Sequence, residues 1–216
     1  MAGLKYDRAY EEPVTLRDGT EAWVRLLRPS DAGLLAAGFD RLSPESRYRR
    51  FLSAKTSLSA EELRYLTEVD GVDHFAIGAV RRLPDGVEEG LGIARFVRLP
   101  GEPAVAEAAI AIVDDAQRQG LGRALLRRLA GAAAERGVER FRCDVLESNA
   151  PIRRLLGDLA CDVTRVPAGD GVVGLEVDVA DLAAPPAVPN LADRLIGLAA
   201  EGLIVVRRAF GRPPVR

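Results

Sequence analysis

The segment AQRQGLGRALL, residues 116–126, contains the residue types best suited to binding an anion. Gly120 and Gly122 stand directly before an apolar helical run, and Arg118 and Arg123 flank them. Glycine has no Cβ, so backbone N–H groups beside it can come close to a ligand. The first N–H groups of a helix lack partners, and the helix dipole makes that end positive. The segment therefore suits a pyrophosphate, although two glycines before a helix also occur in ordinary strand-to-helix turns.

Two common phosphate-binding patterns do not fit this segment. In the pattern G-x-G-x-x-G the third glycine would stand where the chain has Leu125. In the pattern G-x-x-x-x-G-K-[ST] a lysine would follow the last glycine, and none does. The residues therefore argue against both a Rossmann fingerprint and a P-loop.

The segment lies between a predicted strand and a predicted helix. The strand is PAVAEAAIAIV (103–113), which is small and apolar. The helix, 120–136, ends before Gly137, and its apolar stripe consists of Leu121, Leu125, Leu129 and Ala132. Downstream, RFRCDVL (140–146) alternates as a strand does, and Ser148 and Asn149 form a capping site for a short helix.

The remaining elements predict an α/β protein with a mixed (α+β) sheet. Two short strands surround the Asp18-Gly19 turn, and three helical stretches follow, beginning at Ser30, at SPESRYRRFL and at the Ser59–Glu62 capping box. Residues 74–83 and 89–99 read as an antiparallel pair, and CDVTRV and VVGLEVDV as a final hairpin. Strands with interleaved helices indicate a layered α/β architecture.

Composition limits the classes of function. The chain has 216 residues, 48% of them hydrophobic, and a formal net charge of −2, which argues against a disordered chain or a general nucleic-acid binder. The two cysteines, Cys143 and Cys161, and the single histidine, His74, fit no metal or disulfide spacing. No signal peptide is visible, and LIVV (203–206) is too short to span a membrane. We expect a cytoplasmic protein with free thiols, no metal site and no membrane contact.

Two parts of the chain are expected. Residues 1–180 form one domain, and residues 181–216 contain a Pro-rich linker, LAAPPAVP (182–189), and a C-terminal helix over 190–210. The apolar side of that helix could cover this domain or a second subunit, which leaves a homodimer possible.

Together these features resemble the GNAT acyl-CoA-dependent N-acetyltransferases. QRQGLG (117–122) matches the family signature [RQ]-x-x-G-x-[GA]. Glu107 stands about ten residues upstream of it, and Asn149 caps the helix after the next strand, as in the family. The order of elements agrees over roughly residues 14–180. The resemblance implies the GNAT fold, a mostly antiparallel sheet flanked by helices, with acetyl-CoA as co-substrate.

The resemblance also implies roles for individual residues. The backbone of Ile112 and Val113 would pair with the pantetheine arm of acetyl-CoA like an additional strand. Asn149 would hydrogen-bond the pantetheine, although helix capping alone would also explain an asparagine there. The pyrophosphate would lie among the amides of the loop that comprises Gln117, Arg118, Gln119, Gly120, Leu121, Gly122 and Arg123.

Glu107 is the candidate general base. A lysine-like amine has a pKa near 10, so it must lose a proton before it attacks a thioester. Glu107 is a lone charge in an apolar strand, where partial burial would raise its pKa; a solvent-exposed glutamate is the alternative. The position that holds a tyrosine acid in the family is Leu156 here, so the general acid is not assigned. Cys143 and Cys161 read as core residues, and His74 as structural.

The sequence predicts the cofactor but leaves the identity of the acceptor amine open. LSPESRYRRFL (42–52) and residues 58–80 resemble the catalytic domain of bacterial protein lysine acetyltransferases, in which the matching glutamate is the general base. Those enzymes usually carry a second, regulatory domain, and only 36 residues follow position 180 here. Three hypotheses stay open: acetylation of a protein lysine, acetylation of a small amine such as a polyamine, amino acid or drug, and a non-catalytic acyl-CoA-binding module.

Overall fold

A computed structural model describes residues 4–158, 163–167 and 171–183. The chain divides into two compact units, Met1–Ala184 and Pro185–Arg216, and the described residues belong to the first. Cys161, the predicted helix over 190–210 and most of the predicted linker lie outside the described residues.

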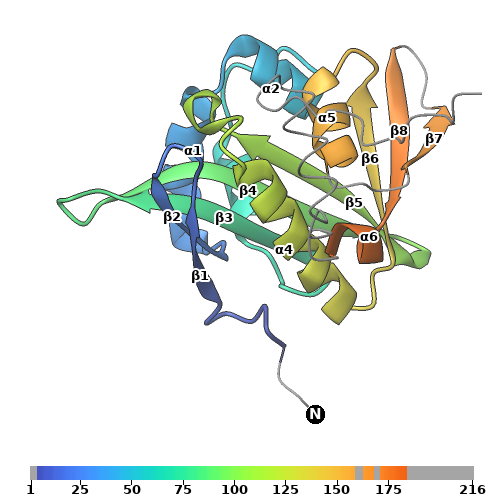
Figure 1. Cartoon of the computed structure of the whole chain (residues 1–216), viewed down its shortest axis with the longest axis horizontal. Coiled ribbons are helices and arrows are strands. Elements are labelled where there is room, and N and C mark those ends of the chain that lie inside the picture. Colours follow the sequence, from blue (N-terminus) through green and yellow to red (C-terminus); the bar gives the residue numbers. More distant parts are fainter. Residues whose placement is uncertain (1–3, 159–162, 168–170, 184–216) are drawn as a thin grey trace, which may run out of the picture. The chain divides into compact units, whose positions relative to one another are not determined.

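The described part of the chain forms one eight-stranded sheet with the order β1-β2-β3-β4-β5-β6-β8-β7 (Figure 1). Neighbouring strands are antiparallel except β5 and β6, which are parallel, so the predicted mixed sheet is confirmed. The strands are Glu11–Thr15 (β1), Glu21–Leu26 (β2), His74–Arg82 (β3), Glu88–Leu99 (β4), Glu102–Ile112 (β5), Arg140–Leu146 (β6), Val163–Pro167 (β7) and Val172–Asp178 (β8).

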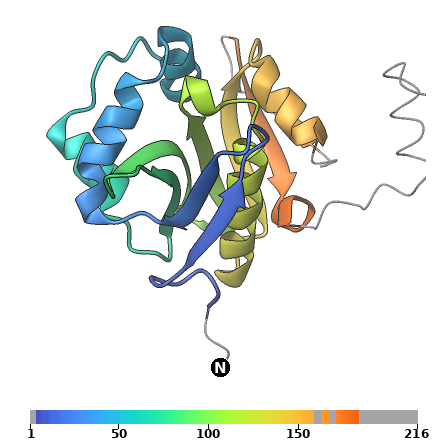
Figure 2. The same ribbon diagram turned by 60° about the vertical axis from the view of Figure 1, so that its left-hand side comes forward.

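Helices cover both faces of this sheet, with α1 and α4 on opposite sides (Figure 2). The α-helices are Ala32–Asp40 (α1), Pro44–Phe51 (α2), Ala60–Thr67 (α3), Leu121–Glu135 (α4), Ala150–Asp158 (α5) and Val179–Ala183 (α6). Short 3-10 turns at Pro29–Asp31 and Asp114–Ala116 precede α1 and the loop before α4.

The predicted apolar stripe of α4 forms part of the core. Leu121, Leu125, Leu129 and Ala132 are all fully buried, and α4 contacts β3, β4 and β5. Gly137 adopts φ +73° after the helix. Its amide donates a hydrogen bond to the Ala134 carbonyl, and the Val138 amide donates one to the Ala133 carbonyl. This C-terminal motif needs a left-handed residue, which explains the glycine and fixes where the chain turns toward β6.

The helix starts are mostly as predicted, with one correction. Ser59 accepts the Glu62 amide while Glu62 accepts the Ser59 amide, so the predicted capping box is confirmed. Ser30 is not the N-cap of α1, because the 3-10 turn Pro29–Asp31 precedes the helix and Asp31 occupies the N-cap position. The buried Asp31 carboxylate instead accepts the Arg28 amide at 2.7 Å.

The end of the domain also differs from the prediction. Leu182 and Ala183 belong to α6, which contacts α4, and Leu182 is buried. The folded domain therefore continues beyond residue 180, and the first residues of the predicted linker are part of it. Within the described residues, no helix is long and apolar enough to cross a membrane.

Candidate functional site

An opening in the sheet between β5 and β6 dominates the site. The two parallel strands pair over Val105↔Arg140, Ala106↔Phe141 and Glu107↔Arg142. Pairing ends there, although β5 continues to Ile112 and β6 to Leu146. The edge of β5 after Glu107 is therefore available to an extended ligand, which can add to it like a strand.

The hydrogen bonds at the end of β5 show which backbone groups face this opening. The Val113 amide donates to the Leu91 carbonyl at 3.0 Å, next to the Gly92↔Ile112 pair. In an antiparallel ladder this makes Gly92 and Ile112 a non-hydrogen-bonded pair, so the Ile112 N–H and C=O point away from β4. The Ile112 carbonyl accepts from Gln117 Nε2 at 3.1 Å, which leaves the Ile112 amide to face the opening.

The backbone pairing of Ile112 and Val113 with a ligand stays a prediction, and the register with β4 favours Ile112 for it. The Val113 amide is bonded to Leu91, and its carbonyl accepts the Ala116 amide at 3.0 Å. Both backbone groups of Val113 therefore hold the turn at the end of β5. The direction of each amide alternates along a strand, so it follows from the sequence only when the register with β4 is known.

The glycine-containing loop at residues 117–123 has the shape of an anion-binding site. Arg118 and Gly120 adopt positive φ values of 61° and 88°, and left-handed residues within a turn direct successive amides toward one point. Helix α4 starts at Leu121, and its first helical bond runs from the Ala124 amide to the Gly120 carbonyl at 3.1 Å. The amides of residues 121–123 therefore have no helical acceptor, as at any helix N-terminus.

The two glycines of the loop differ in what they require. Gly120 needs its left-handed conformation, which a side chain would strain. A Cβ on Gly122 would lie 3.5 Å from Leu155 Cδ2, which is an ordinary contact. The backbone conformation at position 120 thus requires glycine, whereas the protein atoms around position 122 leave room for a Cβ.

Surrounding residues fix the loop in place. Gln117 Nε2 donates to the Ile112 carbonyl, to Asp114 Oδ1 at 3.1 Å and to Ser46 Oγ at 3.3 Å. The Arg17 amide donates to the Gln119 carbonyl at 3.1 Å, which ties the loop to the β1–β2 hairpin. The Gln117 side chain therefore holds the loop against the end of β5 and the start of α2.

Asn149 lies at the start of α5 and is nearly buried. Its Oδ1 accepts the Ile152 amide at 3.3 Å, so its predicted capping role is confirmed. The cap uses only the oxygen, and the Nδ2 group is the part of the side chain able to donate to a ligand.

Glu107 is exposed, which corrects the prediction of partial burial. Its side chain lines a cavity of ≈290 Å³ that is formed between β4, β5 and helices α2 and α3. The sequence could not show this cavity, because it depends on how far α2 and α3 stand from the sheet. The lining residues are Arg50, Phe51, Leu58, Glu62, Tyr65, Leu66, Arg95, Val97, Glu107 and Ala109.

Sequence reasoning missed Arg95, a buried guanidinium on β4. Arg95 pairs with Ala109 in the β4–β5 register, is only 4% exposed, and places its guanidinium carbon 5.1 Å from the Tyr65 ring centroid. Neither of its Nη atoms has a hydrogen-bond partner among the described residues. Burial lowers the pKa of Arg95 to about 10. An arginine within the apolar run GLGIARFV could have drawn attention to it, by the reasoning applied to Glu107.

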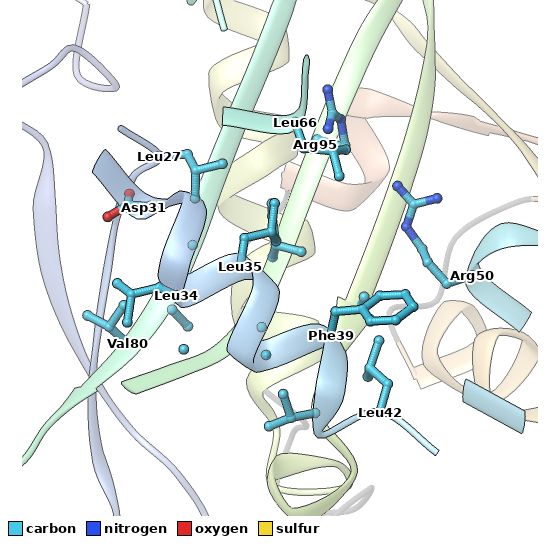
Figure 3. Close-up of a pocket in the computed structure, with 18 of the residues that line it drawn as sticks. Leu27, Asp31, Leu34, Leu35, Phe39, Leu42, Arg50, Leu66, Val80 and Arg95 are labelled. Atoms are coloured by element: carbon cyan, nitrogen blue, oxygen red, sulfur yellow. The ribbon is translucent and has the colours of Figure 1, made fainter. Parts of the chain in front are cut away.

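A second, mostly apolar cavity of ≈80 Å³ lies beneath α1 (Figure 3). Leu34, Leu35 and Phe39 project into it, and Asp31 lies at one side. Arg50 and Arg95 lie on the side away from Asp31, and both line the cavity that contains Glu107 as well (Figure 3). These two arginines therefore stand where the cavities meet.

The other residues considered for chemistry have structural surroundings. Leu156 is buried in the core and provides no acid. Cys143 packs against the core, and burial raises the pKa of its thiol to about 12. Burial, together with the charge of Arg95, lowers the pKa of His74 to about 4, and its ring lies 5.0 Å from that of Tyr65. No cluster of three His, Cys, Asp or Glu residues able to hold a metal occurs in the described ranges.

The parallel strands β5 and β6 thus open toward the N-terminus of α4, next to a cavity that contains a carboxylate, as the resemblance to the GNAT family implies. The family model of the acetyltransferase (GNAT) family matches residues 39–158. The chain belongs to this family.

Several known proteins are similar to the chain. It is 34% identical over 190 residues to acetyltransferase Pat of Mycolicibacterium smegmatis, covering 85% of this chain and 53% of that protein. The chain thus spans about half the length of Pat. It is 30% identical to acetyltransferase PA5475 of Pseudomonas aeruginosa over 147 residues, covering 68% of this chain and 76% of that protein. The GNAT domain of S. lividans PAT superposes with a TM-score of 0.71 at 32% identity, covering 80% of this chain and 99% of that one.

Proposed function

We propose that the chain transfers the acetyl group of acetyl-CoA to a primary amine, the side chain of a protein lysine, with Glu107 as general base. The observation that carries this proposal is the course of β5. Its edge becomes unpaired after Glu107 and leads toward the loop at the N-terminus of α4. One extended ligand could therefore reach from the carboxylate to an anion-binding loop.

The residues divide the reaction between them. The Ile112 amide and Asn149 Nδ2 would hold the pantetheine arm, and the amides from Arg118 to Arg123 would hold the pyrophosphate. The amine nitrogen attacks the thioester carbon, the C–S bond breaks, and the amine's proton passes to Glu107 directly or through water. A thiol has a pKa near 8.5, so the CoA thiolate can leave without a dedicated acid, in keeping with the leucine at position 156.

Replacement of Gly120 by alanine is expected to weaken acetyl-CoA binding. A left-handed alanine costs about 1 kcal/mol, and relief of that strain would move the amides of the loop, so we expect roughly fivefold to tenfold lower affinity. Titration calorimetry with acetyl-CoA measures the change. Gly101→Ala is the matched control, because Gly101 has a similar left-handed φ of 79° and open space around it, but lies in the β4–β5 turn, outside the 117–123 loop. Equal losses in both variants would contradict the role of Gly120.

Two replacements of Asn149 separate capping from ligand binding. Asn149→Ala should lose about 1 kcal/mol of stability because the Ile152 amide loses its acceptor. Asn149→Asp retains an oxygen for the cap and removes the Nδ2 donor. If Asn149 binds pantetheine, Asn149→Asp should unfold like the wild type yet bind acetyl-CoA more weakly. Normal binding by this variant would leave Asn149 with the cap alone.

The similarity to Pat and to the S. lividans PAT domain supports a protein lysine as acceptor. The competing small amines are distinguished by comparing kcat/KM for lysine-containing peptides with blocked termini, for polyamines and for amino acids. Mass spectrometry then locates the acetyl group. Acetylation of the lysine ε-amine is the expected result, and turnover of small amines alone would contradict the protein substrate.

A further inference from the structure

Arg95 is a buried cation that has no ion-pair partner among the described residues. Its side chain is on β4 and 4% exposed, and both Nη atoms are without a hydrogen bond in the part of the chain described. The Tyr65 ring lies beside the guanidinium, but a ring face replaces only part of the lost hydration. A buried charge without a partner is costly, so such a group in a cavity points to an anion that completes it.

Its neighbours increase the positive charge of the cavity. Arg50, from α2, lines the same cavity as Arg95. Burial lowers the pKa of Arg50, whereas the Glu107 carboxylate counters that effect. Two guanidinium groups therefore share the cavity with one catalytic carboxylate.

Neither carboxylate of the cavity forms a close ion pair with Arg95 in the described part of the chain, although the charge of Glu107 favours the protonated guanidinium. Glu62 is paired with Lys55 Nζ at 2.5 Å and also accepts the Ser59 amide. Among the described residues, no ion pair joins Glu107 to Arg50 or Arg95. Glu107 therefore remains available to an amine, and Arg95 to an anion of the acceptor.

We propose that the acceptor carries a carboxylate near its reacting amine, and that Arg95, assisted by Arg50, binds this carboxylate. The planar guanidinium fork matches a carboxylate in two parallel hydrogen bonds. Phe51, Leu58, Leu66 and Val97 provide apolar walls for the aliphatic part between carboxylate and amine. A phosphate would bring more negative charge beside Glu107, so the geometry favours the carboxylate.

This proposal deepens the proposed function and rests on it for the amine. The carboxylate has two possible sources. An acidic side chain beside the acetylated lysine agrees with the protein acceptor of the proposed function, whereas the α-carboxylate of a free amino acid would replace that acceptor.

Matched acceptors test the proposal. We would measure kcat/KM for free lysine against lysinamide, and for a blocked peptide with glutamate beside its lysine against the same peptide with glutamine. The wild type should prefer the carboxylate member of at least one pair by about tenfold or more, as expected for charge-assisted hydrogen bonds. The pair that shows the preference identifies the source of the carboxylate.

Variants connect the preference to the arginines. Arg95→Gln should abolish it by slowing the carboxylate acceptor and not the amide, and Arg50→Gln should reduce it. Arg64→Gln is the control, because Arg64 is exposed on α3 and does not line the cavity. If Arg95→Gln folds poorly, Arg50→Gln provides the readout, because the Arg50 side chain is only partly buried and its replacement should disturb the fold less.

A binding measurement separates this proposal from the proposed function. An NMR titration compares butyrate with butyramide on the wild type and on the two variants. Preferential butyrate binding that depends on the arginines, without turnover of any amine, would keep the anion site and reject the acetyltransferase. Equal use of acid and amide, or a preference that survives both arginine variants, would overturn the anion site.

Discussion

Glu107→Gln is expected to lower kcat/KM for the amine acceptor by about 10²- to 10⁴-fold, the usual contribution of a general base. Glutamine has nearly the same shape as glutamate but cannot accept the proton of the attacking amine. Glu107 is exposed to its cavity, so the change should not disturb the core. Affinity for acetyl-CoA should be unchanged, because the cofactor would be held by Ile112, Asn149 and the 117–123 loop.

Glu102→Gln is the matched control for this prediction. Glu102 is also an exposed glutamate of β5, but it pairs with Arg142 and does not line the cavity. Its replacement should leave turnover near the wild-type value. Steady-state release of the CoA thiol measures both variants, and undiminished turnover by Glu107→Gln would remove Glu107 from the mechanism.

Asp31→Asn is expected to destabilise the fold by about 3 kcal/mol, since it breaks a buried ion pair. Asp31 accepts two hydrogen bonds from Arg25, at 2.8 and 2.9 Å, and Arg25 is 2% exposed. Loss of the carboxylate charge leaves Arg25 in the core with Glu88 as its remaining charged partner, at 2.6 Å. Because Asp31 also precedes α1, the damage should extend to the helix that covers the apolar cavity.

Urea unfolding measures this loss, with Glu88→Gln as control. Glu88 is partly exposed, and Arg25 would keep Asp31, so its replacement should cost about 1 kcal/mol or less. Similar losses in the two variants would contradict the idea that the Asp31–Arg25 pair is the stabilising one.

The same pair predicts how stability depends on pH. Burial opposes ionisation of Asp31, but hydrogen bonds from Arg25 and the Arg28 amide outweigh it and lower the pKa of the carboxyl. A depressed pKa means that the ionised form favours the folded state. The contribution is therefore complete above the unfolded pKa of about 3.9, and it is lost as the pH falls through the folded value. Asp31→Asn should remove this part of the acid destabilisation.

Local sequence patterns predicted most of the fold, because they depend on neighbouring residues. The apolar stripe of α4, the left-handed Gly137 and the Ser59–Glu62 capping box each follow from residues within a few positions of one another. The prediction of Ser30 as the N-cap of α1 was wrong because the cap depends on a side-chain contact with another element. Arg25 on β2 draws Asp31 into the core, and a 3-10 turn containing Ser30 results.

The candidate site was predictable where it is built from one segment, and not where several elements meet. The loop at 117–123 and the position of Glu107 follow from a continuous stretch of chain. The register that turns the Val113 amide toward Leu91, and the Ile112 amide toward the opening, depends on another strand. The exposure of Glu107 and the cavity with Arg95 depend on packing between β4, β5, α2 and α3, which no local pattern contains.

The most direct test of the central claim mixes the purified protein with acetyl-CoA and a panel of amines and lysine-containing proteins. Thiol release and mass spectrometry follow both products. The proposed function predicts one N-acetylated amine for each CoA released, and it predicts that Glu107→Gln lowers the formation of both products by the same large factor. Tight binding of acetyl-CoA without acetylation of any acceptor would contradict the proposed function and favour a non-catalytic acyl-CoA-binding module.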